Sequence, residues 1–273
     1  SSAVLAEGLD AIVSANWYSN FGPVERRFRE AIAEYLGALP EQIVTMNNAT
    51  TGLMAALAAF LPKGDGSETI AIASFTFAAG AQAILWHGYR PAWMDIDTET
   101  LQPSLSSFRE LLRHDPGIKA ILLTNTFGIG TVEIGEWESL AAELGIPLIV
   151  DSAAGFGSRY SDGARLGLHG SCEVFSFHAT KPFAIGEGGA VVCRDVESAT
   201  RMREFTNFGF SPELGATSIG LNGKLQELNA AIGLRQLLTF DQSLTARQGT
   251  FDHYEELLSG LPLRFPDGSR ESS

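Results

Sequence analysis

The amino-acid sequence predicts an α/β protein built on a mostly parallel β-sheet. Short apolar runs alternate with segments of helical periodicity along most of the chain, and several of the runs are apolar at nearly every position. A strand that is covered on both faces has such a sequence, and strand–helix alternation favours a parallel sheet. Sheets of this kind bind ligands at the carboxyl ends of their strands.

Seven strand-like runs follow one another along the chain. They cover residues 42–46, 69–73, 91–95, 119–124, 147–151, 172–177 and 189–193. The link over residues 178–188 is too short for a full crossover helix, so we expect the last two runs to be neighbours around a loop. We expect no strand after Asn207.

Helix-period segments lie between and after the strand-like runs. They cover residues 24–36, 50–61, 77–86, 105–112, 134–144, 196–205, 224–238 and 244–258. The last segment ends at Gly260, and the polar, turn-rich sequence PDGSRESS closes the chain.

The composition is that of an ordinary globular protein, with 273 residues, 45% of them hydrophobic and 19% charged. The formal net charge of −13 argues against nucleic acid and against an anionic membrane as partners. No apolar run approaches the roughly 18 residues of a membrane span, and the N-terminus lacks the basic region of a signal peptide. Cys172 and Cys193 are expected to be reduced thiols of a cytoplasmic protein, with a single bridge as the alternative.

Common motifs of phosphate, metal and hydrolase sites do not occur. The sequence has no Walker A loop, no HExxH pair and no GxSxG elbow, and its five histidines are scattered, so we expect no metal site. Gly128-Ile129-Gly130 follows a strand-like run but lacks the third glycine of a dinucleotide site. We interpret it as a simple turn.

Two features lie directly after strand-like runs. Residues 48–52, Asn-Ala-Thr-Thr-Gly, open an apolar helix whose free N–H groups and positive end make a natural phosphate cradle. An ordinary N-cap formed by Asn48 or Thr50 is the other interpretation. Asp151 ends its run, so its carboxylate is expected in the ligand crevice, paired with a cationic group; otherwise it caps the following turn.

A third feature is the sequence FSFHATK at residues 175–181. Ser176 and His178 lie on the same face of the expected strand, and Lys181 is followed by Pro182 and by the glycine-rich stretch 186–189. A lysine in poorly solvated surroundings suits Schiff-base chemistry. An exposed loop lysine is the alternative.

A fourth feature is the segment 220–228, which leads into a helix. Asn222 is placed to cap that helix, and Lys224 is expected in its first turn, where the helix dipole disfavours a cation. Such a lysine either meets an anionic ligand or is simply solvated.

Together these blocks resemble the DegT/DnrJ/EryC1/StrS family of pyridoxal-phosphate aminotransferases, which act mainly on nucleotide-linked keto-sugars. The resemblance runs from about Trp17 to Leu238, in the blocks NNATTGL, ASFTFAA, RPAWMDID, TNTFGIG, VDSAAGFG, FSFHATKPF, GEGGAVV and GLNGKLQELNAAIGL. It implies the fold-type-I aminotransferase fold, with a seven-stranded, mostly parallel sheet sandwiched by helices and a smaller C-terminal domain. We therefore expect an N-terminal arm at 1–23, a large cofactor-binding domain at 24–240, and the truncated start of a C-terminal domain at 241–273.

The resemblance also implies catalytic roles. Lys181 matches the lysine that forms the Schiff base with pyridoxal 5'-phosphate, and Asp151 matches the acid that pairs with its pyridine nitrogen. The family usually has His or Gln three residues after this aspartate, and here that position is Ala154. Relatives that replace the lysine with histidine are sugar dehydratases, so Lys181 disfavours that activity.

Further matches concern cofactor binding. Ala49, Thr50 and Ser176 match donors to the cofactor phosphate, and Phe77 matches the aromatic residue that stacks on the pyridine ring. Asn222 matches a residue that reaches the phosphate in the neighbouring subunit, which implies a homodimer with shared sites.

The expected function is therefore transfer of an amino group from an amino acid, with glutamate as the first candidate, to a keto group of a nucleotide-linked sugar. Lys224 is a candidate contact for the anionic diphosphate of that sugar. Two alternatives are dehydration on the same scaffold and a non-catalytic relative that binds the cofactor or a sugar nucleotide. The presence of both Lys181 and Asp151 favours an enzyme.

Overall fold

A computed structural model of the chain describes residues 2–211 and 214–273. Its centre is a seven-stranded sheet in the order β1-β7-β6-β5-β4-β2-β3. The strands are β1 (Ile43–Met46), β2 (Thr69–Ala73), β3 (Arg90–Met94), β4 (Ile121–Thr124), β5 (Leu148–Asp151), β6 (Cys172–Ser176) and β7 (Gly189–Cys193). Only β7 runs antiparallel to its neighbours in this sheet, so the prediction of a mostly parallel sheet is confirmed.

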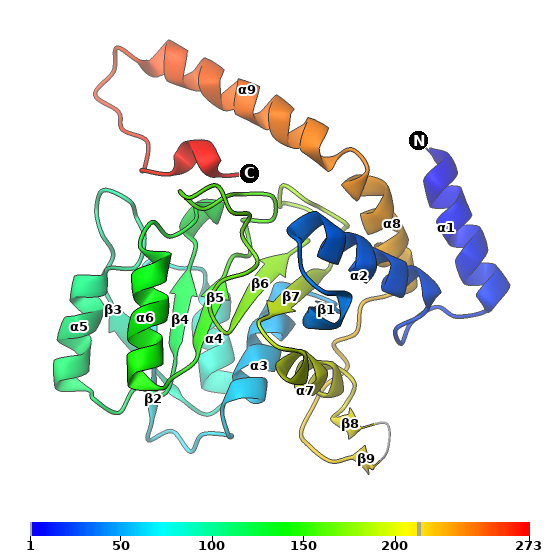
Figure 1. Cartoon of the computed structure of the whole chain (residues 1–273), viewed down its shortest axis with the longest axis horizontal. Helices are drawn as coiled ribbons and strands as arrows, with labels where there is room; N and C mark the ends of the chain where they lie inside the picture. Colours follow the sequence, from blue (N-terminus) through cyan, green and yellow to red (C-terminus); the bar gives the residue numbers. More distant parts are fainter. Residues whose placement is uncertain (1, 212–213) are drawn as a thin grey trace.

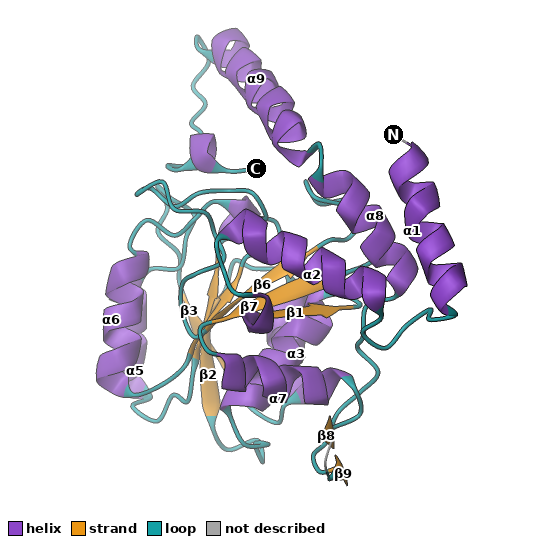
Figure 2. Ribbon diagram, turned by 45° about the vertical axis from the view of Figure 1, so that its right-hand side comes forward, coloured by secondary structure: helices purple, strands orange, loops and turns teal. Residues whose placement is uncertain are grey.

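Helices cover both faces of the sheet (Figures 1 and 2). One face carries α2 (Pro23–Leu36), α5 (Leu105–His114), α6 (Ile134–Leu144) and α8 (Glu227–Leu237), and the other carries α3 (Ala49–Phe60), α4 (Ala78–Trp86) and α7 (Val196–Thr206). Each face has its own apolar core. Ala71 and Ala73 of β2 belong to the first core and Ile70 and Ile72 to the second, because successive side chains of a strand point to opposite faces.

The remaining elements lie outside this sandwich. Helix α1 (Ser2–Ala15) packs on α8 (Figure 1). Helix α9 (Phe240–Leu258) has one buried residue, Phe240, at its start. A small hairpin joins β8 (Phe210–Ser211) to β9 (Gly215–Ala216). Three short 3-10 helices are η1 (Pro40–Gln42), η2 (Thr126–Gly128) and η3 (Ser269–Glu271).

The segment that follows α7 differs from the prediction in two ways. Strands do not stop at Asn207, because β8 and β9 pair and Asn207 itself bridges to Asn222. Helix α8 begins at Glu227 with Gln226 as its N-cap, so Asn222 does not cap it and Lys224 lies before its first turn. The Asn47 N–H donates to the Gly223 carbonyl at 2.8 Å, and this backbone pairing holds the segment out of the helix.

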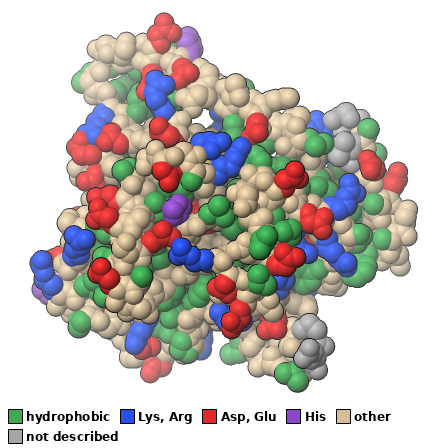
Figure 3. All heavy atoms as spheres, in the orientation of Figure 1, with side chains coloured by type: hydrophobic (Ala, Val, Ile, Leu, Met, Phe, Trp, Pro, Cys, Tyr) green, Lys and Arg blue, Asp and Glu red, His purple; other side chains and the backbone are tan. Residues whose placement is uncertain are grey.

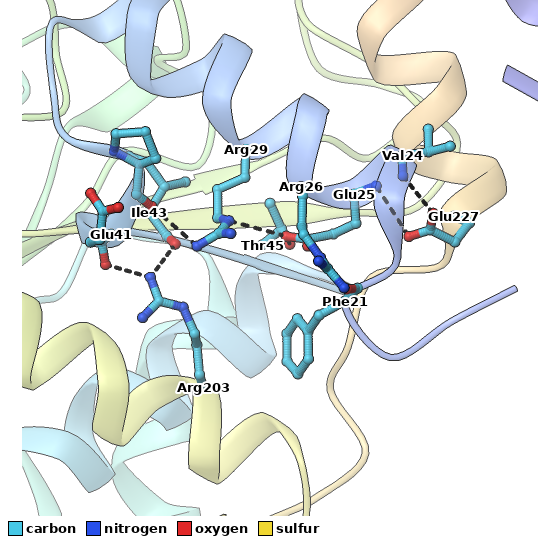
Figure 4. Close-up of polar contacts among 11 residues, drawn as sticks. Phe21, Val24, Glu25, Arg26, Arg29, Glu41, Ile43, Thr45, Arg203 and Glu227 are labelled. Carbon is cyan, nitrogen blue, oxygen red and sulfur yellow. Dashed lines mark hydrogen bonds and ion pairs between the residues drawn. The ribbon is translucent and has the colours of Figure 1, made fainter. Parts of the chain in front are cut away.

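A buried glutamate joins α8 to α2. The carboxylate of Glu227 accepts hydrogen bonds from the N–H groups of Val24 at 2.7 Å and Glu25 at 3.1 Å (Figure 4). These N–H groups belong to the first turn of α2, which has no partner for them within the helix. Glu25 in turn accepts from the Thr45 hydroxyl of β1 at 2.6 Å. The contacts fix both helices beside the sheet edge at β1.

The surface carries mixed charge. Figure 3 shows acidic and basic side chains interspersed over the face viewed in Figure 1. Within residues 2–211 and 214–273, none of the helices is both long enough and apolar enough to span a lipid bilayer. Cys172 and Cys193 are buried and free, as the sequence predicted.

Candidate active site

A cleft opens at the carboxyl edge of the sheet. Because β7 is antiparallel, its first residue, Gly189, lies beside Ser176 at the end of β6. Two adjoining cavities of about 320 and 750 Å³ open at this edge. They share Phe77, Asp151 and Lys181, so they are two parts of one cleft.

The first turn of α3 borders the larger cavity. Asn48 is the N-cap, and its side chain accepts from the Thr51 N–H at 2.8 Å. The N–H groups of Ala49 and Thr50 have no acceptor within the helix, and both residues line the cavity. The two interpretations of this segment, an N-cap and a phosphate cradle, are therefore compatible. Asn48 accepts from one N–H group of the first turn and leaves those of Ala49 and Thr50 for a ligand.

The opposite wall of the larger cavity comes from β6. Ser176 is buried, and its Oγ accepts from the His178 N–H at 3.3 Å. The hydroxyl hydrogen of Ser176 is thus available to a ligand in the cavity. Together with the first turn of α3 it forms a set of neutral donors suited to an anion such as phosphate.

Asp151 ends β5 at the floor of the cleft and lines both cavities. One carboxylate oxygen accepts from the Ala153 N–H at 3.0 Å, so Asp151 also caps the following turn. Burial raises the pKa of Asp151 to about 6, an effect that the Ala153 N–H and the charge of Lys181 oppose. A buried carboxylate of this kind gains most from a cationic partner.

Lys181 projects from a loop that is tightly held. The Lys181 N–H donates to the His178 carbonyl at 2.9 Å, and the Ala179 N–H donates to the Gly186 carbonyl at 2.8 Å. Two residues on, Phe183 is buried against Phe177, with ring centroids 5.0 Å apart. The half-buried lysine therefore lines the cleft from a rigid loop rather than from an exposed one.

Aromatic residues form the outer wall. Phe77 is 80% exposed and lies at the junction of the two cavities. Phe75 and Phe127 line the smaller cavity and contact edge to face at 5.9 Å. Phe127 has a φ of 58° and Gly128 a φ of 84°, so the Gly128–Ile129–Gly130 segment begins in a turn, as predicted.

The larger cavity brings together most of the residues that the sequence singled out. Its lining includes Ala49, Thr50, Phe77, Asp151, Ser176 and Lys181. Asn222 and Lys224 are not among the lining residues of either cavity. Lys224 is buried with its amine 4.8 Å from the ring centroid of Phe208, and burial lowers its pKa.

Among the lining residues that were not predicted as site residues, three polar ones lie together in the loop that carries Lys181. His178 contacts the Thr180 hydroxyl at 2.9 Å through Nδ1 and the Glu187 carboxylate at 3.5 Å through Nε2. All three lie at the Lys181 end of the larger cavity. The signal in the sequence was their position, because all belong to the loop between β6 and β7 that already carried the lysine.

No metal centre is evident in the described part of the chain. There, no group of three or more His, Cys, Asp or Glu side chains is placed to hold a metal ion.

Comparisons with known proteins point to one family. The model of the DegT/DnrJ/EryC1/StrS aminotransferase family matches residues 3–273. The chain is 47% identical to Protein Rv3402c of Mycobacterium tuberculosis, over 99% of this chain and 66% of that protein. It is 32% identical to the dTDP-4-amino-4,6-dideoxy-D-glucose transaminase of Shigella dysenteriae, over 97% of this chain and 70% of that enzyme.

A solved structure agrees with these relatives. The structure of DesI in the presence of its TDP-sugar product matches with a TM-score of 0.87 and 34% identity, over 100% of this chain and 67% of that one. The fold predicted from the resemblance is thereby confirmed. The chain spans about two thirds of the length of each of these relatives.

Proposed function

The chain belongs to the DegT/DnrJ/EryC1/StrS aminotransferase family, and we propose that it binds pyridoxal 5'-phosphate and moves an amino group from an amino acid to a keto group of a nucleotide-linked sugar. The observation that carries the proposal is the convergence of Lys181, Asp151 and the first turn of α3 on one cavity. The names of similar proteins support the substrate class, since one is a dTDP-sugar transaminase and another was solved with a TDP-sugar product.

The donor set of the larger cavity fits this cofactor. The N–H groups of Ala49 and Thr50 and the hydroxyl of Ser176 would hold its phosphate. Asp151, a buried carboxylate with no cation in hydrogen-bond contact, would pair with its ring nitrogen. Phe77 would cover the ring, and the Lys181 amine would anchor the cofactor covalently. When bound, pyridoxal 5'-phosphate supplies an electron sink for the carbon that loses its proton.

The two ionisable residues have distinct tasks. Ionised Asp151 would hold a proton on the ring nitrogen, because a buried negative charge favours a cation beside it. Lys181, once released by the amino donor, would take the substrate proton at Nζ and return it at the neighbouring atom as a general base and acid. The rigid loop of Lys181 keeps that amine in the cleft during both steps.

The His178 end of the cavity would face the substrates. Thr180 and Glu187 are exposed there, and they offer a hydroxyl and a carboxylate to sugar hydroxyl groups. Asn222 does not line either cavity, so the role that the resemblance implies for it would be in the site of a second subunit, within a homodimer with shared sites. The two free cysteines support a cytoplasmic location.

The test is spectroscopic and uses the full chain. Purified protein is incubated with pyridoxal 5'-phosphate and then with glutamate while the visible absorbance of the bound cofactor is followed. We expect a new absorbance band on cofactor addition and its loss on adding glutamate. Lys181→Ala should form no such band, whereas Lys119→Ala, a surface lysine paired with Glu68, should behave as the wild type. A panel of keto-sugar nucleotides then identifies the acceptor.

The outcomes separate the alternatives. A band that forms but does not respond to any amino donor would favour a non-catalytic relative. A sugar nucleotide consumed without amine incorporation would favour dehydration. A protein that forms no band, or an unchanged band in Lys181→Ala, would overturn the proposal.

A further inference from the structure

A buried carboxylate lies below the cleft without lining it. Glu173 is the second residue of β6, and its neighbours in register are Val150 and Val192 of the apolar core under α2 and α6. It is fully buried, and the proposed chemistry does not use it. An ionised group in such a place is costly unless hydrogen bonds satisfy it.

The hydrogen bonds around Glu173 have a fixed direction. Asn125 Oδ1 accepts from the N–H and hydroxyl of Thr131 at 2.9 and 2.8 Å. The Asn125 amide nitrogen therefore donates, to Ser152 Oγ at 2.7 Å and to the Tyr160 hydroxyl at 3.2 Å. Each hydroxyl then directs its own hydrogen to Glu173 Oε1, with Tyr160 at 3.1 Å.

The second carboxylate oxygen is also satisfied. Glu173 Oε2 accepts from the Gly167 N–H at 2.6 Å. Every one of these contacts to the carboxylate comes from a donor, which is the pattern that an acceptor-only carboxylate needs. Burial raises the pKa of Glu173, and these hydrogen bonds oppose that rise. A glutamine would place its NH₂ group against one of these donors whichever way it turned.

Two residues of this network, Ser152 and Asn125, also form backbone hydrogen bonds at the floor of the cleft. Ser152 follows Asp151 directly, and its N–H donates to the Val174 carbonyl at 2.9 Å. Asn125 lines the smaller cavity, and its N–H donates to the Asp151 carbonyl at 3.0 Å. The backbone at Asp151 is therefore held by Asn125 and Ser152, and the side chains of both residues donate hydrogen bonds to Glu173.

We propose that Glu173 is a positioning residue that fixes the Asp151 carboxylate in the cleft through Ser152 and Asn125. This inference rests on the proposed cofactor site, in which Asp151 meets the ring nitrogen. Glu173 touches neither cofactor nor substrate. Its carboxylate orients the side chains of the two residues that directly follow β4 and β5, and the N–H groups of these residues hold the peptide unit between Asp151 and Ser152.

The experiment compares Glu173→Gln and Ser152→Ala with a matched control. In the control, Asp115→Asn, the altered carboxylate accepts from the Thr69 hydroxyl at 2.5 Å near the start of β2, away from the cleft. Three quantities are measured for each variant: the cofactor dissociation constant by titration of the apoprotein, the midpoint of urea denaturation, and amide hydrogen exchange of the apoprotein.

We expect both network variants to bind pyridoxal 5'-phosphate roughly tenfold more weakly, because a less firmly held Asp151 would meet the ring nitrogen less well. Amide exchange should rise in residues 125–131 and 151–155 and stay unchanged in α2. Asp115→Asn should lower the urea midpoint while keeping the cofactor affinity within about twofold.

Two results would overturn the inference. One is a lower urea midpoint in Glu173→Gln with unchanged cofactor affinity, which is what a merely structural role produces. The other is exchange at 151–155 equal to that of the wild type. If the wild type bound no cofactor, the proposed function would fail, and the exchange measurement on the apoprotein would still decide the role of Glu173.

Discussion

Asp151 makes the stability of the apoprotein sensitive to pH. Burial raises its pKa from 3.8 to about 6. Between about pH 4 and pH 6 the folded chain keeps a proton that the unfolded chain has lost, so the free energy of unfolding falls as the pH rises through this range. Above it, the ionised carboxylate is a cost to the apoprotein that a cationic ring nitrogen would offset.

Replacing this residue should therefore separate stability from function. We expect Asp151→Asn to raise the free energy of unfolding of the apoprotein at pH 8 by about 3 kcal/mol, with little gain at pH 4. Transamination should fall at least about a hundredfold, because a neutral amide does not keep the ring nitrogen protonated. Urea denaturation at both pH values and a coupled assay measure the two effects.

Asp162→Asn is the matched control. Asp162 accepts from the N–H two residues on, at 2.8 Å, as Asp151 does, but it is exposed. Its replacement should change neither the pH dependence nor the activity. An Asp151→Asn protein less stable than the wild type at pH 8 would contradict the assigned cost of burial.

Sequence alone could predict residues that line the cleft. Asp151 was singled out because a charged residue at the end of an apolar run lies at the carboxyl edge of a parallel sheet. Lys181 was singled out by its poorly solvated, proline- and glycine-rich surroundings, and both residues line the cleft. Glu173 could not be found in this way. The position of a glutamate within the run 172–177 does not predict its hydrogen-bond partners. Asn125 and Tyr160, which donate to Glu173, come from other parts of the chain.

At the scale of elements, the start of β7 packs closely against the start of α3. A Cβ atom on Gly189 would lie 2.7 Å from the Phe175 carbonyl oxygen and 3.0 Å from the Ala49 nitrogen. Both are backbone atoms, which cannot move aside as a flexible side chain can. The proposed phosphate donors therefore depend on a residue with no side chain at this point.

We expect Gly189→Ala to push α3 away from β7 and to weaken cofactor binding at least about tenfold, with a loss of roughly 1–3 kcal/mol in stability. Gly135→Ala in α6 is the control, since nothing lies within 4 Å of its added Cβ, and it should be neutral or slightly stabilising. The cofactor affinities of the two variants are measured by titration. Equal affinities would contradict the proposal that close packing at Gly189 keeps the phosphate donors of α3 in place.

The boundaries of the elements show how far the sequence pattern predicts the fold. The strands were predicted to within two residues because both faces of the sheet are apolar. The hairpin β8–β9 and the late start of α8 were not predicted. In this region the backbone of Asn207 pairs with that of Asn222, and this pairing overrides the helical pattern of the sequence. Such pairing depends on how the chain folds back and leaves no periodic signal.

At the scale of the whole molecule, the hairpin region presents apolar side chains to solvent. Leu214 is 77% exposed and Ile219 is 80% exposed, while Phe208 is half exposed. Asn222 lies in the same region. These side chains support the proposed homodimer, in which the region would meet a second copy.

Shared sites predict complementation between inactive variants. Lys181→Ala and Asn222→Ala should each be strongly impaired alone. Mixed after unfolding and refolding together, half of the dimers would contain one of each, and one of their two sites would be intact. Activity should then recover to roughly a quarter of the wild type. A monomer by light scattering, or no recovery on mixing, would argue against shared sites.

The place of β1 in the sheet has a consequence for synthesis. It is an edge strand whose single partner is β7, so Ile43 pairs with Val192 from much later in the chain. As the chain leaves the ribosome, β1 must wait for nearly the whole sheet to emerge, because β7 is the last strand of the sheet to be synthesised. Pairing between residues so far apart in the chain is also slow. Until then the apolar side chains of Val44 and Met46 have no cover from β7. Nascent chains should therefore be most prone to aggregation just before Cys193 emerges.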